Sequence, residues 1–74
     1  MFKLEIGQHL EFIEPARVDG RAIAKGTRVR VGHITEELTE PKVTLIVLGR
    51  EPPETLMVER HVVTLHCRPL ASAA

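Results

Sequence analysis

The stretch Thr27-Arg28-Val29-Arg30-Val31-Gly32-His33-Ile34 begins as a regular alternation of polar and apolar residues. Because successive side chains of a β-strand point to opposite faces, this pattern places Val29 and Val31 on one face. Arg28 and Arg30 then lie on the other face. The pattern predicts a half-buried antiparallel strand, and it indicates that the fold is built mainly of β-structure.

A second strand is predicted from residues 43–48, which are rich in β-branched and aliphatic side chains. Val43, Leu45 and Val47 mark one face of this strand, and Ile46 and Leu48 mark the other. A strand in a single small sheet needs only one apolar face. The excess of apolar residues therefore predicts that something covers the second face.

Two explanations for this second apolar face remain open. The alternating segment Phe2-Leu4-Ile6 can fold back as an extra strand that covers it. Alternatively, the face contacts a second copy of the chain or another protein. The same apolar excess recurs in residues 56–58 and 62–65, so the question concerns more than one strand.

The remaining strands are predicted from short apolar runs bounded by turn residues. Gly20 and Gly26 mark turns, and two adjacent prolines make residues 49–54 a connection, because proline cannot sit inside a sheet. The segment 36–41 is expected to be a loop or a single helical turn. No long helix is predicted, and further strands are expected near residues 10–13, 55–59 and 62–67.

The expected fold is all-β: a single small antiparallel barrel of five to six short strands. A long first connection over residues 14–26, and a brief break at Glu59-Arg60-His61 before the last strand, resemble the Src-homology-3-like small barrels in architecture. This resemblance implies the fold and no particular activity. One domain is expected over residues 1–70, followed by a flexible tail at residues 71–74.

A local excess of positive charge lies between residues 17 and 34, where Asp19 is the one acidic residue. Such a basic stripe can contact phosphates, a nucleic-acid backbone or an acidic protein surface. The simpler interpretation is a solvated face whose arginines pair with Glu11, Glu14 or Glu36. The residues of the basic stripe are Arg17, Arg21, Lys25, Arg28 and Arg30.

The composition excludes several modes of recognition. The 74 residues include only 3% aromatic residues, Phe2 and Phe12, with no Trp or Tyr. Grooves for proline-rich peptides, cages for methyl-lysine and stacking platforms for single-stranded nucleic acid all need aromatic faces. The ten basic and ten acidic residues cancel, so the total charge predicts no bulk attraction to nucleic acid or to anionic membranes.

The same composition predicts where the protein acts. One cysteine cannot form an internal disulfide, which suits a reducing compartment. The first residues carry no basic segment followed by an apolar run, so no secretory signal is expected. The longest unbroken apolar stretch, residues 45–48, is far shorter than the roughly 20 residues of a membrane helix. We therefore expect a cytoplasmic protein that does not enter membranes.

No residues are arranged in the patterns that catalysis or metal binding requires. His66 and Cys67 are adjacent, so in a strand they point to opposite faces and cannot easily share a metal ion. Ser72 is the only serine and lies in the expected tail. The glycines mark turns and form no phosphate-binding loop. We expect no metal, no cofactor, no small-molecule substrate and no enzymatic activity.

The function that these features favour is a protein-interaction or assembly-accessory module. It would bind a protein partner, or a second copy of itself, through the apolar face marked by Ile46 and Leu48, with help from the basic stripe. One alternative is a nucleic-acid-associated barrel that contacts phosphates through Arg17–Arg30. Another is a small regulatory or structural subunit of an enzyme complex.

Overall fold

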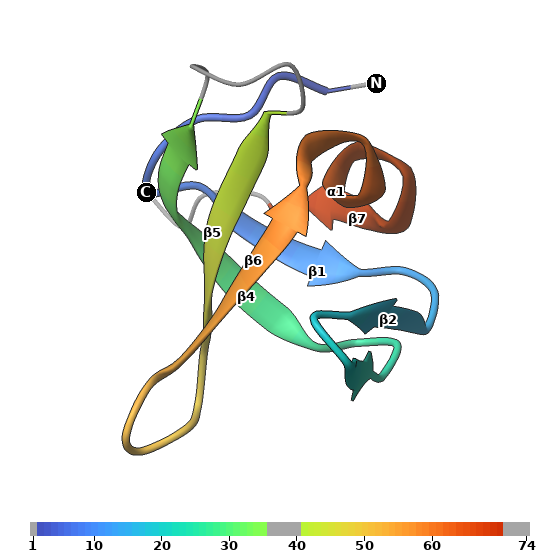
Figure 1. Cartoon of the computed structure of the whole chain (residues 1–74), viewed down its shortest axis with the longest axis vertical. Coiled ribbons are helices and arrows are strands. Elements are labelled where there is room, and N and C mark those ends of the chain that lie inside the picture. Colours follow the sequence, from blue (N-terminus) through green and yellow to red (C-terminus); the bar gives the residue numbers. More distant parts are fainter. Residues whose placement is uncertain (1, 36–40, 71–74) are drawn as a thin grey trace.

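The alternating stretch forms strand β4 (Arg28–Thr35), which lies at the centre of a five-stranded antiparallel sheet in the order β6-β5-β4-β1-β7 (Figure 1). The computed structural model describes residues 2–35 and 41–70, so the expected loop at residues 36–40 and the expected tail at residues 71–74 lie outside the described residues. The other strands of this sheet are β1 (His9–Phe12), β5 (Lys42–Val47), β6 (Glu54–Glu59) and β7 (Cys67–Pro69). The prediction of a mostly β, antiparallel fold is confirmed.

The long first connection contains a hairpin, of which the sequence predicts only the turn. Strands β2 (Ala16–Val18) and β3 (Arg21–Ile23) pair with each other and form a separate two-stranded sheet. The two residues between them, Asp19 and Gly20, have φ values of 52° and 75°. Positive φ at both central positions is the requirement of the tight turn that best matches the twist of two antiparallel strands. The described residues therefore contain seven strands in place of the expected five to six.

One predicted strand is wrong: residues 60–66 form the helix α1 (Arg60–His66) instead of extended backbone. Their β-branched residues favour a strand by propensity, but burial decides otherwise. Val63 and Cys67 are buried, whereas Leu65 between them is 61% exposed. Residues four apart, such as Val63 and Cys67, share one face of a helix. In an extended strand Leu65 would lie on the same face as Val63 and Cys67 and would be buried with them. The helix thus inserts Val63 into the core, and β7 begins only at Cys67.

The buried side chains form one core cluster on the inner side of the sheet. Val29 and Val31 of β4 belong to it, as predicted, because the alternation of β4 leaves Arg28 and Arg30 exposed. The remaining buried side chains come from every strand, from α1 and from the N-terminal segment: Leu4, Leu10, Phe12, Val18, Ile23, Val43, Leu45, Val47, Leu56, Val58, Val63 and Cys67.

The N-terminal segment packs against the core but forms no strand within residues 2–6. Leu4 is buried, Phe2 is partly buried, and Ile6 is exposed. The N–H of Gly7 donates to the carbonyl oxygen of Val31 at 2.7 Å, which attaches the end of this segment to β4. The extra strand over the second apolar face, one of the two explanations left open above, is therefore absent from the described residues.

A bulge in β4 changes the pairing of β4 with β5. The register shifts between Val31 and His33, so Gly32 is the extra residue. A Cβ atom at Gly32 would lie 3.1 Å from Cδ1 of Ile46, which shows how closely this isoleucine covers the glycine backbone. Ile46 is thus held against the outer side of the sheet and is only partly exposed.

Candidate interaction surface

The side of the sheet that faces away from the core carries most of the exposed charge of β1 and β4. We call this side the outer face, and the register of the strands defines its members. Arg28 and Arg30 lie on it because Val29 and Val31 point inward. The outer face comprises His9, Glu11, Arg28, Arg30, His33, Thr35, Lys42, Thr44, Ile46, Leu48, Thr55, Met57, Glu59 and Arg68.

Arg30 lies at the junction between the charged and the apolar parts of the outer face. Its cross-strand neighbour on β1 is His9, and its cross-strand neighbour on β5 is Ile46. Leu48 continues the apolar part, because its N–H donates to the carbonyl oxygen of Arg28 at 3.0 Å. Two of the predicted cations and both predicted apolar residues therefore share one surface. Leu48 is 37% exposed and Met57 is 57% exposed, so a partner can reach both.

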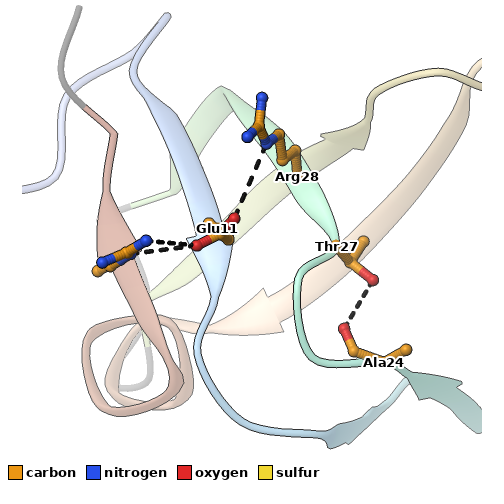
Figure 2. A network of polar contacts seen from close by, with 5 residues as sticks. Glu11, Ala24, Thr27 and Arg28 are labelled. Carbon is orange, nitrogen blue, oxygen red and sulfur yellow. Dashed lines mark hydrogen bonds and ion pairs between the residues drawn. The ribbon is translucent and has the colours of Figure 1, made fainter.

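Glu11 connects two arginines from different strands (Figure 2). The guanidinium of Arg68 donates two hydrogen bonds to Oε1 of Glu11, at 3.1 Å from Nε and 2.8 Å from Nη2. Nε of Arg28 lies 3.8 Å from Oε2 of the same carboxylate. The Glu11 side chain is 18% exposed, whereas the two arginines remain more than 60% exposed. One carboxylate thus balances about one of the two positive charges and leaves the outer face cationic.

The five residues of the predicted basic stripe do not form one continuous stripe. Arg28 and Arg30 lie on the outer face, but Arg17 and Arg21 belong to the β2–β3 hairpin, which is a separate sheet. Arg21 forms an ion pair with Glu54 of β6. Lys25 lies in the turn before β4, where it lines a shallow hollow together with residues of β1 and with Arg68.

Arg68 and Met57 are members of the outer face that sequence reasoning missed. Arg68 lies 57 positions after Glu11, so no local sequence pattern predicts their contact. Only the pairing of β7 with β1 brings them together, with Glu11 and Arg68 as cross-strand neighbours. Met57 could have been found from alternation, because it separates the buried residues Leu56 and Val58.

Cys67 and its histidine neighbour do not form a reactive or metal-binding centre in the described part of the chain. Burial raises the pKa of the Cys67 thiol to about 12, because a thiolate would lose its hydration there. Nδ1 of His66 lies 3.8 Å from Oε1 of Glu14. Among residues 2–35 and 41–70, no three His, Cys, Asp or Glu side chains converge as metal ligands do. The same residues contain no helix that is long and apolar enough to cross a membrane.

The outer face therefore combines a cationic part on β1, β4 and β7 with an apolar part on β5 and β6. Comparison of the chain with protein-family models, with curated proteins and with solved structures gives no match.

Proposed function

We propose that this protein is a non-catalytic interaction module that binds an acidic and partly apolar surface of a partner protein through its outer face. The observation that carries the proposal is the position of Arg30, which has Ile46 as its direct neighbour on β5 and lies two residues from Arg28 on the same face of β4. Arginine beside an accessible apolar side chain is the combination that protein interfaces favour at their centres.

The charge of the outer face indicates the chemistry of the partner. Arg28, Arg30 and Arg68 outnumber Glu11 on the part of the sheet formed by β1, β4 and β7. A partner that presents carboxylates near apolar side chains complements both parts of this surface. The apolar part would supply most of the affinity, and the arginines would orient the partner and speed its association.

The fold proposed for this module is a small barrel similar to the Src-homology-3-like barrels. Two features support the proposal: the long first connection, which contains the β2–β3 hairpin, and the helical segment α1 that interrupts the chain between β6 and β7. With two phenylalanines as its only aromatic residues, such a barrel would not read proline-rich peptides. Its partner would be recognised by charge and by aliphatic contact.

The arrangement of the cations favours a protein partner over nucleic acid. Phosphate binding needs several cations that point at one backbone. Here the five predicted cations are divided between the outer face, the β2–β3 hairpin and the turn before β4, and Arg21 forms an ion pair with Glu54. The nucleic-acid alternative therefore serves as one outcome of the test below.

The test is affinity capture from a lysate of the source organism after nuclease treatment. We expect the double substitution Arg28→Gln and Arg30→Gln to reduce the captured partner at least about tenfold, because it removes two interface arginines. The matched control, Arg17→Gln with Arg21→Gln, makes the same change in net charge on the β2–β3 hairpin, which is a separate sheet, and should retain the partner. Nuclease-sensitive capture, or equal capture by the two double variants, would contradict the proposal.

A substitution with the opposite effect is Glu11→Gln. Without the carboxylate, the guanidiniums of Arg28 and Arg68 lose their internal partner and become available to an acidic surface. We expect the affinity for the captured partner to rise several-fold, while the free energy of unfolding falls by about 1 kcal/mol, since both arginines of these ion pairs are solvent-exposed. Titration calorimetry and urea denaturation measure the two quantities. A lower affinity in a normally stable variant would count against an acidic partner.

A further inference from the structure

Two of the four histidines of this chain lie on the outer face. His9 begins strand β1, His33 follows the bulge of β4, and both residues are exposed. Histidine is the side chain whose charge changes between about pH 5 and pH 8, whereas arginine keeps its charge throughout this range. The charge of the outer face therefore depends on pH.

His9 is surrounded by arginines. Arg30 of β4 is its direct cross-strand neighbour, and Arg28 is the outward-facing residue two positions before Arg30. On the other side of β1, strand β7 contributes Arg68, which lies opposite Glu11. Glu11 is the next outward-facing residue of β1 after His9, and its carboxylate is shared by Arg28 and Arg68 (Figure 2). A positive charge on His9 therefore adds to a surface that is already cationic.

His33 also lies where cations outnumber carboxylates. Three elements flank it: β4 itself, β5 and the N-terminal segment, whose end is hydrogen-bonded to β4. Its cross-strand neighbour on β5 is the uncharged Thr44. In the part of the chain that the structure describes, neither His33 nor His9 forms an ion pair with a carboxylate. The charged residues that these elements contribute to this end of β4 and its border are Arg30, Lys42, Lys3 and Glu5.

The other two histidines lie beside carboxylates. Nε2 of His61 lies 3.3 Å from Oε2 of Glu59, and Nδ1 of His66 lies 3.8 Å from Oε1 of Glu14. Both histidines belong to helix α1. A positive charge on either of them is met by its own carboxylate, so it adds little to the attraction of an acidic surface. His61 and His66 therefore provide a control within the same chain.

We propose that the outer face binds carboxylate-rich surfaces more tightly as the pH falls from about 8 to about 6, because His9 and His33 then add positive charge beside Arg30. This inference rests on the proposed function, since it concerns the same surface and the same acidic partner. While both imidazoles are neutral, three arginines and one carboxylate give the part on β1, β4 and β7 a net charge of about +2. Protonation of both raises this charge to about +4.

Binding and protonation favour each other at this surface. An imidazolium at position 9 or 33 repels the neighbouring arginines, and a bound carboxylate offsets this repulsion. The coupling is reciprocal: protonation raises the affinity for the acidic surface by the same factor by which binding favours protonation. In water, a unit charge about 5–7 Å from a carboxylate changes the affinity about threefold. Two histidines that are mostly protonated at about pH 6 therefore give about a fivefold effect.

The first test measures binding to poly-L-glutamate at about pH 8 and about pH 6. The ionic strength is fixed at about 20 mM, where surface charges are weakly screened. We expect the affinity of the wild-type protein to rise about fivefold between the two pH values. The double variant His9→Gln with His33→Gln should lose most of this rise. The matched control, His61→Gln with His66→Gln, removes the same number of histidines and should keep it.

The outcomes separate this inference from the proposed function. An absent rise in the wild-type protein, or an equal rise in the two double-histidine variants, overturns the inference and leaves the acidic partner in place. If Arg28→Gln with Arg30→Gln binds poly-L-glutamate as tightly as the wild-type protein at about pH 8, the outer face is not the binding surface. The proposed function then fails, and this inference fails with it.

Proton NMR supplies a second measurement on the wild-type protein, so it does not depend on the folding of a variant. Because binding favours protonation, poly-L-glutamate should raise the protonated fraction of His9 and His33 at about pH 6.5. Their Cε1–H signals should move towards the positions that they have in acid, while the signals of His61 and His66 stay in place. Equal movement of all four signals, or no movement for His9 and His33, overturns the inference.

Discussion

Replacing Phe12 with alanine is expected to lower the free energy of unfolding by about 3–5 kcal/mol. Phe12 is the largest side chain that is fully buried, and its removal leaves a cavity in the single core cluster. The whole stability of a chain of 74 residues is about 4–11 kcal/mol. The loss is therefore a large part of the whole stability, and it unfolds the variant at 25 °C if the wild-type value lies near the lower end of this range. Urea denaturation followed by circular dichroism measures the loss.

The neighbouring residue supplies the control for this prediction. Ile13 is 40% exposed, so Ile13→Ala removes less buried surface and should cost no more than about 1 kcal/mol. Phe12→Leu keeps most of the side-chain volume and should give an intermediate loss that can be measured even if the alanine variant does not fold. Equal losses for Phe12→Ala and Ile13→Ala would show that the core is not centred on Phe12.

The thiol of Cys67 is expected to react at least about 1,000-fold more slowly in the native protein than in the unfolded chain at pH 8. Burial raises its pKa from the ordinary value of 9.0 to about 12, and each unit lowers the thiolate fraction tenfold. The side chain is also 3% exposed, which slows access of the reagent further. Absorbance of a chromogenic disulfide reagent, with and without urea, measures the two rates.

The same difference in pKa gives a pH dependence of stability that serves as a check. Above pH 9 the unfolded thiol loses its proton, whereas the native thiol keeps it until about pH 12. The unfolded state then binds fewer protons, so the free energy of unfolding falls by up to about 1.4 kcal/mol per pH unit in that window. Cys67→Ala should lack this component when compared between pH 8 and pH 10. A slope that survives in the variant would assign it to other groups.

Sequence patterns predicted the strands in which burial alternates. β4 and β5 belong to this class, because Val29, Val31, Val43 and Leu45 are buried while their chain neighbours are more exposed. The helix α1 escaped prediction because the β-branched residues Val62, Val63 and Thr64 favour extended backbone, and only the position of the core shows that a helical turn buries Val63. In this segment the burial of Val63 in the core outweighs the strand propensity of the β-branched residues.

The candidate surface was predicted in part, because alternation within a strand shows which of its residues share a face. Alternation within β4 places Arg28 and Arg30 on one face, and alternation within β5 places Ile46 on one face. Only the antiparallel register makes Arg30 and Ile46 direct neighbours. Arg17 and Arg21 were predicted to join the other cations because they are close to them in sequence. In the structure they lie on the β2–β3 hairpin, which forms a separate sheet.

By itself, the sequence determined which side chains of the alternating strands, such as β4 and β5, face the core and which face water, because a period of two is a property of one strand and its own residues. Tertiary structure alone decided which strands lie side by side. The contact between Glu11 and Arg68 and the neighbourhood of Arg30 and Ile46 both follow from strand order and register. These depend on pairing between segments far apart in the chain, and the free energy of that pairing comes from the shared core and not from any local pattern.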